Sequence, residues 1–166
     1  MKQERLEFHL VTEDRDMADL SQRQRQAEEL FRSGYNCSQA VIGVFCDKLG
    51  LDFDAVMKLS EGFGGGMGRM RLTCGAVSGM TMAAGALLSR GAGSGDTRAA
   101  VYSKVQELAE LFKEMNGSII CAELLGLNSG EKQPSAPEAR TEQYYKKRPC
   151  IRCVTDCVKI IEDNLF

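Results

Sequence analysis

The chain has 166 residues, of which 43% are hydrophobic and 27% charged, a balance typical of one globular unit and not of a disordered chain. Its 21 basic and 23 acidic residues give a net charge of −2, so no positive excess is present to bind nucleic acid. The single histidine, His9, excludes sites built on several histidines, whereas seven cysteines and 17 glycines are unusually many.

The N-terminal sequence is charged from Lys2 onward and contains no apolar signal-peptide core. An odd number of cysteines spread over this length is also untypical of a secreted disulfide scaffold, so we expect a reducing, cytoplasmic location. We expect residues 1–19 to form an N-terminal extension, in which residues 6–11 alternate like a strand or belong to a mobile tail. Residues 20–166 are expected to form a single cysteine-containing helical domain.

Helical signals dominate the rest of the chain and predict an all-α fold, a compact multi-helix bundle. Asn36 and Gln39 form a capping-box pattern, Gly50 ends the helix that follows them, and Asp52 begins the next one. Residues 128–149 are polar, contain all three prolines and predict an exposed loop around one helical turn. In chain order, the predicted helices cover residues 20–32, 36–49, 52–60, 74–88, 94 or 96 to 115, 118–126, 142–147 and 150–163.

Residues 62–95 hold 11 of the 17 glycines. Within them, the helix at 74–88 is uncharged, but its many small residues predict a central, closely packed helix and not a membrane span. Residues 62–68 predict a Gly-rich loop before that helix. This loop is interpreted either as a tight connection between packed helices or as an anion cradle, with Arg69 and Arg71 holding a phosphate or carboxylate.

Four cysteines are predicted to lie in the first turn of four different helices: Cys37, Cys74, Cys121 and Cys150. Free backbone N–H groups and the positive end of the helix dipole favour a thiolate at such positions and lower the thiol pKa. If these helix starts converge, the chain holds a cluster of activated thiols. Of the remaining cysteines, Cys46 and Cys157 are predicted to be core residues, while Cys153 is interpreted as a core residue, a resolving thiol or a further ligand.

The segment Cys74-Gly-Ala-Val-Ser-Gly79 shows the pattern CGAxxG. Together with the residues around Cys37, the loop Phe63–Gly68, Cys121 and a final cysteine before an apolar helix, it resembles the C_GCAxxG_C_C family of small bacterial and archaeal redox-active proteins. The resemblance extends from about Leu30 to Leu165 and leaves the N-terminal residues outside.

The resemblance implies a redox role and four characteristic cysteines, which map onto Cys37, Cys74, Cys121 and a C-terminal cysteine. Cys150 is preferred for the last position because Val154 and Val158 follow it at helical spacing, and Cys153 is the alternative. No specific reaction is carried over, because the family's role is itself inferred from its cysteines.

Two functional hypotheses follow from these residues. In the first, the chain is a thiol-dependent oxidoreductase in which Cys74 reacts and Cys37 is the first candidate to resolve the product. In the second, the same sulfurs bind zinc or an iron–sulfur cluster, with Cys37, Cys74, Cys121, Cys150 and Cys153 as the ligand set.

The sequence leaves open whether a cofactor is present at all. It also leaves open whether the partner is a redox protein or a small-molecule substrate, and whether the chain forms a homo-oligomer. The residues are also compatible with a small-anion-binding module and with a structural protein whose buried cysteines are inert.

Overall fold

The protein was analysed as a computed structural model that describes residues 19–91, 95–128 and 131–166. Over these ranges the fold is all-α, as predicted, with a single isolated β-bridge and no strand. The prediction for residues 6–11 lies outside the described residues. The helices are α2 (Gln22–Arg32), α3 (Cys37–Gly43), α4 (Cys46–Leu49), α5 (Phe53–Ser60), η2 (Glu61–Phe63), α6 (Gly64–Met67), α7 (Gly75–Leu88), α8 (Gly95–Asn116), α9 (Cys121–Leu124), α10 (Glu142–Lys147) and α11 (Cys150–Leu165).

The helix starts in the first part of the chain follow local capping signals. Asn36 and Gln39 form the predicted capping box at the start of α3, and the Asp52 carboxylate caps α5. The expectation of one continuous helix up to Gly50 is wrong, because the chain leaves helical geometry between α3 and α4. The carbonyl of Val44, which lies at this break, accepts a hydrogen bond from the guanidinium of Arg23, so the break leaves that carbonyl satisfied.

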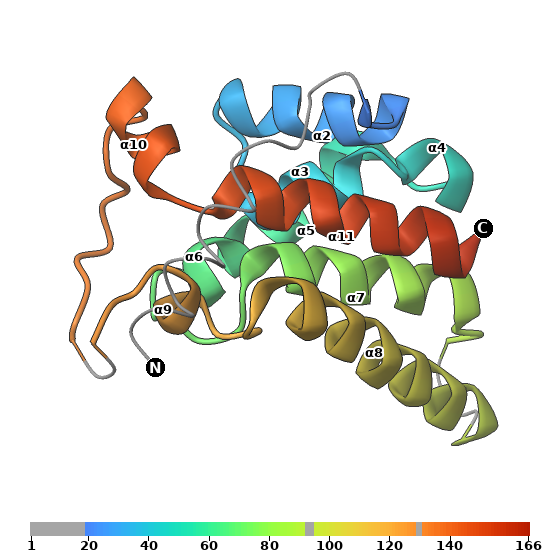
Figure 1. Cartoon of the computed structure of the whole chain (residues 1–166). Helices are drawn as coiled ribbons and strands as arrows, with labels where there is room; N and C mark the ends of the chain where they lie inside the picture. The colour runs from blue at the N-terminus through green and yellow to red at the C-terminus, as the bar shows by residue number, and fades with distance from the viewer. Residues whose placement is uncertain (1–18, 92–94, 129–130) are drawn as a thin grey trace.

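Helix α7 is central, as its small residues predict, and packs against α3, α8 and α11. At Gly79 the contact with α3 is very close: a Cβ atom there would lie 2.7 Å from the carbonyl oxygen of Ser38. Gly85 has no such neighbour within 4 Å, so packing does not require a glycine at that position. Helices α7 and α11 run side by side through the molecule (Figure 1).

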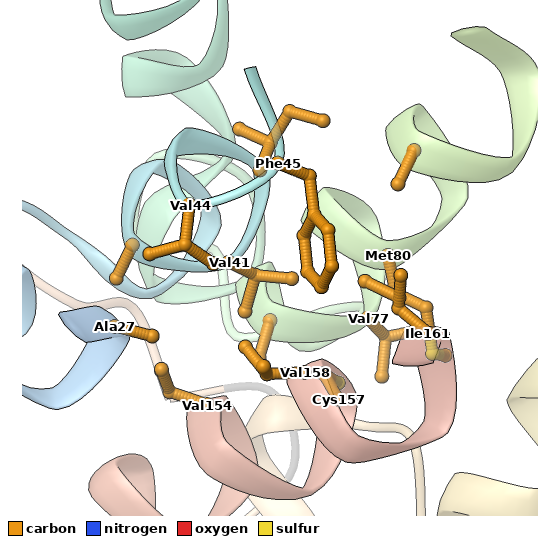
Figure 2. Close-up of a cluster of buried hydrophobic side chains, with 14 of the residues drawn as sticks. Ala27, Val41, Val44, Phe45, Val77, Met80, Val154, Cys157, Val158 and Ile161 are labelled. Atoms are coloured by element: carbon orange, nitrogen blue, oxygen red, sulfur yellow. The ribbon is translucent and has the colours of Figure 1, made fainter. Parts of the chain in front are cut away.

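The core lies between α2, α3, α7 and α11. Figure 2 shows Val41 and Phe45, Val77 and Met80 of α7, and Val158 of α11 pointing into one shared apolar cluster. Phe45, Met80 and Val158 are fully buried. This packing fixes α7 and α11 relative to one another, and it therefore fixes the residues at the start of each helix.

The starts of α7 and α11 lie at the same end of the molecule (Figure 1). Helix α8 runs back alongside α7 and returns the chain to that end, where α6 and α9 lie. The connection to α10 extends from the same region. Segments far apart in the sequence therefore meet around the first turns of α7 and α11.

None of the helices in the described ranges combines the length and apolar character that crossing a membrane would require.

Candidate functional site

All four cysteines predicted to lie at helix starts do so. Cys37, Cys121 and Cys150 are the first residues of α3, α9 and α11, and Cys74 is the N-cap of α7. Two details differ from the predictions. Helix α9 begins at Cys121 and not at residue 118, and Cys74 is the N-cap of α7 and so lies before its first turn.

These four cysteines line one pocket of about 420 Å³. Cys153, on the second turn of α11, lines it as well. Cys157, one turn further along α11, points into the apolar core, as predicted (Figure 2). Cys46 is also buried, as predicted, and does not line this pocket. All seven cysteines are free thiols.

An antiparallel bridge pairs Thr73 with Ile120, the residues directly before Cys74 and Cys121. The backbone N–H of Cys74 donates to the carbonyl of Ile119 at 2.8 Å, and that of Cys121 donates to the carbonyl of Leu72 at 2.6 Å. Since successive side chains of an extended segment point to opposite faces, the residues on either side of the bridged pair share one face. This bridge therefore turns two helix starts toward the same pocket.

The Gly-rich segment gives the cysteines room. A Cβ atom on Gly75 would lie 2.4 Å from the Sγ of Cys37, and one on Gly66 would lie 2.8 Å from the Cβ of Cys121. Both distances are too short for a side chain, so the absence of one at each glycine lets a cysteine approach the backbone. Packing thus requires these two glycines.

The chain from α6 to the bridge has an unusual backbone. Gly65, Gly66, Met67, Gly68 and Arg69 have φ values between 55° and 69°, which makes this segment a left-handed turn. Arg71 follows with φ of 61°. A left-handed conformation costs a residue with a side chain about 1–2 kcal/mol, so the surrounding packing must hold these residues in place. The sequence predicts a Gly-rich loop here but not its handedness.

Cys74 is the electrostatic centre of the thiol cluster. Its thiol hydrogen-bonds to Cys153, and this bond, together with burial, raises the pKa of Cys74 well above its ordinary value. The backbone amides of Val77 and Ala76 act in the opposite direction. A charge on Cys74 also contributes to the raised pKa of each of the other nearby thiols, which are Cys37, Cys121, Cys150 and Cys157.

The expectation of lowered thiol pKa values is wrong. Burial, together with the charges of neighbouring thiols, raises the pKa of Cys37 to about 12 and that of Cys150 to about 12. The amide of Gly65 opposes this at Cys37, and the guanidinium of Arg148 opposes it at Cys150. Loss of water around the sulfurs therefore outweighs the helix starts, and the thiols are neutral near pH 7.

Cys121 differs from the other pocket cysteines because a cation touches its sulfur. The Nη1 atom of Arg71 donates a hydrogen bond to the Sγ of Cys121 at 3.7 Å. Burial still raises the pKa of Cys121, but the hydrogen bond from Arg71 and the charges of Arg71 and Arg148 lower it. Arg71 therefore favours a thiolate at this position.

A second wall of the pocket comes from the segment before α11, for which the sequence predicts only an exposed loop. Arg148 stacks on the ring of Tyr144 at 4.5 Å and pairs with Glu138. Arg140 lies 5.1 Å from the same ring and donates to the carbonyls of Phe31 and Tyr35. The sequence signal for this wall is the basic and aromatic run from Arg140 to Arg148.

The predicted metal ligands, Cys37, Cys74, Cys121, Cys150 and Cys153, share this pocket. Within the described ranges, no group of three or more His, Cys, Asp or Glu side chains is arranged to hold a metal ion.

A family model described as "putative redox-active protein (C_GCAxxG_C_C)" matches residues 35–164, a span that contains every cysteine of the pocket. No curated protein and no solved structure matches the chain.

Proposed function

The chain belongs to the C_GCAxxG_C_C family of redox-active proteins, and we propose that it is a thiol-dependent oxidoreductase whose cysteine pocket carries out thiol–disulfide exchange. The observation that carries this proposal is the hydrogen bond between Cys74 and Cys153 at the centre of the thiol cluster. It pairs two sulfurs from different helices inside a pocket, where they can form one disulfide bond.

The proposed reaction transfers two electrons from the protein to the disulfide bond of an oxidised partner. The Cys74 sulfur attacks one sulfur of that bond, forming a mixed disulfide, and the first leaving thiolate takes up the Cys74 proton. The Cys153 sulfur then attacks the Cys74 sulfur and releases the second partner thiol, which takes up the Cys153 proton. The protein gains a Cys74–Cys153 disulfide, and the partner is reduced to two thiols.

The surroundings of Cys74 support its role as the attacking thiol. The amides of Ala76 and Val77 stabilise negative charge on the Cys74 sulfur, and the first turn of α7 adds the positive end of its dipole. Cys153, in turn, is only 2% exposed and lines the same pocket, where it can act as the resolving thiol. The structure thus favours Cys153 over Cys37 as the resolving partner.

The other three pocket cysteines complete the proposed site. We assign Cys37, Cys121 and Cys150 to thiols that exchange with the Cys74–Cys153 disulfide, because each is close enough for a charge on Cys74 to raise its pKa. This chemistry requires reduced cysteines, and the proposal therefore places the protein in the cytoplasm.

The test is mild oxidation of the reduced protein, followed by disulfide mapping. Oxidation should lower the mass by about 2 Da per disulfide and link Cys74 to Cys153. Cys74→Ser and Cys153→Ser should each abolish the stoichiometric reduction of a disulfide substrate to two thiols, whereas Cys46→Ser, which changes a buried thiol outside the pocket, should retain it. Full activity in Cys74→Ser would overturn the proposal.

A further inference from the structure

We propose that Arg71 and Arg69 form an anion subsite beside Cys121, and that the pocket selects small disulfides that carry a carboxylate. This inference rests on the proposed function for the disulfide and on the arginines for the charge. It names a substrate class that the family description does not give.

The first observation is a buried arginine that has no counter-ion among the described residues. Arg71 is only 7% exposed and lines the pocket. Its Nε atom is buried without a hydrogen-bond partner, and within the described ranges Arg71 takes part in no ion pair. A buried guanidinium in this state is costly unless a ligand supplies the missing negative charge.

The second observation is a neighbouring arginine in a similar state. The Nε atom of Arg69 is also buried and unpartnered, and its only ion pair in the described part of the chain is a 3.8 Å contact with Glu138. Glu138 is engaged more closely by Arg148. The left-handed turn and Arg71 after it therefore present two guanidinium groups, each with an unpartnered Nε donor, and a guanidinium matches the planar fork of a carboxylate.

The wider pocket carries the same charge bias. Its lining residues include four arginines, Arg69, Arg71, Arg140 and Arg148, against two glutamates, Glu61 and Glu138. Arg140 and Arg148 already have partners, since Arg140 binds backbone carbonyls and Arg148 pairs with Glu138. The hydrogen-bond donors without a partner thus belong to Arg69 and Arg71, and Arg71 lies next to the Cys121 thiol.

The distance from the subsite to the sulfurs fits a small molecule. Arg71 contacts the Sγ of Cys121 at 3.7 Å, so a carboxylate bound to Arg71 lies within a few bonds of the thiol cluster. A pocket of about 420 Å³ lies in the range that binds small ligands and is narrow for a folded protein partner. A short disulfide with a carboxylate at its end meets both constraints.

The substrate preference is tested with dithiodiglycolate, a disulfide with two carboxylates, and hydroxyethyl disulfide, which is neutral and of similar size. The rate with each disulfide is divided by the rate at which free cysteine reacts with it. On this scale, the protein should react at least about tenfold faster with dithiodiglycolate than with hydroxyethyl disulfide at low ionic strength. Arg71→Gln should remove this preference, so that the two disulfides react at similar rates. Arg90→Gln, an equal loss of charge beyond the far end of α7, should keep it.

Binding without redox chemistry separates this inference from the proposed function. Adipate has the chain length and the two carboxylates of dithiodiglycolate but no disulfide, and calorimetry should show saturable binding that Arg71→Gln or Arg69→Gln weakens about tenfold. Circular dichroism checks that each variant is folded. Absence of saturable adipate binding, or unchanged binding in both variants, overturns the subsite. If adipate binds in an arginine-dependent way but no disulfide oxidises the protein, the subsite is supported and the thiol–disulfide function is rejected.

Discussion

A Cβ atom on Gly75 would lie 2.4 Å from the Sγ atom of Cys37 and 2.8 Å from the carbonyl oxygen of Phe63. The glycine directly after Cys74 therefore makes the space in which a sulfur from another helix reaches the pocket. This relationship gives a physical reason for the glycine in the CGAxxG motif. It also means that the motif acts across two helices, because its second residue faces α3.

Gly75→Ala should therefore destabilise the protein by about 1–3 kcal/mol, because the added methyl group has to displace Cys37 or the backbone. Gly85→Ala, on the same helix but with open space around it, is the matched control. It should be neutral or stabilising by roughly 0.5–1 kcal/mol, since alanine favours a helix over glycine. Urea unfolding followed by circular dichroism measures the free energy of unfolding of both variants. Equal effects would show that the close contact with Cys37 does not affect stability.

The left-handed turn predicts a stabilising substitution. Met67 has φ of 61° and is 46% exposed, so its side chain gains little from packing while its backbone is strained. Met67→Gly should raise the free energy of unfolding by up to about 1 kcal/mol. Met70→Gly is the control, because Met70 is 58% exposed but lacks a positive φ, and it should be neutral or destabilising. A loss of stability in Met67→Gly would contradict the strain.

Arg71 should control the reactivity of Cys121. Without the guanidinium, the pKa of Cys121 rises further, and Arg71→Gln should slow its alkylation by iodoacetamide several-fold at mildly alkaline pH. The rate can be followed on the tryptic peptide 114–132, in which Cys121 is the only cysteine. Arg69→Gln leaves the hydrogen bond to Cys121 intact and should have a smaller effect. Equal rates in the wild type and Arg71→Gln would contradict the assignment.

The raised thiol pKa values also predict how stability changes with pH. The pKa of Cys150 rises from 9.0 to about 12 on folding, so the folded state holds the proton more tightly than the unfolded state. Its contribution to stability is fully present below about pH 9 and is lost as pH rises toward about 12.

Cys150→Ser removes this contribution, so its free energy of unfolding should fall less steeply than that of the wild type across that window. The difference between the two proteins should change by about 1 kcal/mol or more, since one pKa unit corresponds to about 1.4 kcal/mol. Urea titrations at several pH values measure it. A difference between wild type and variant that stays constant with pH would contradict the raised pKa.

Local signals in the sequence predicted much of the fold. The capping box at Asn36, the cap at Asp52 and the single helical turn at Glu142–Lys147 all depend on neighbouring residues, and the structure confirms them. The break between α3 and α4 could not be predicted in this way. The carbonyl of Val44 at this break accepts a hydrogen bond from Arg23 of another helix, a contact between residues distant in the sequence.

In the site, too, local features could be predicted from the sequence, whereas features that depend on the fold could not. The positions of Cys37, Cys74, Cys121 and Cys150 at helix starts are local features, and the prediction is confirmed. Their pKa values depend instead on how much water the fold removes, so the expected direction was wrong.

The hydrogen bond from Cys74 to Cys153 and the pocket wall around Arg148 join segments far apart in the chain. No sequence spacing encodes either of them.

Disulfide mapping after mild oxidation, combined with native mass spectrometry of the anaerobically purified protein, tests the central claim most directly. Trypsin cleaves after Arg152 and so separates Cys150 from Cys153, while Cys74 lies alone in the peptide 72–90. The account predicts a metal-free native mass, a loss of about 2 Da on oxidation and a link between peptides 72–90 and 153–159. The Cys157→Ser variant should give the same link. A native mass that includes bound metal, or a Cys74 that stays unpaired after oxidation, would contradict it.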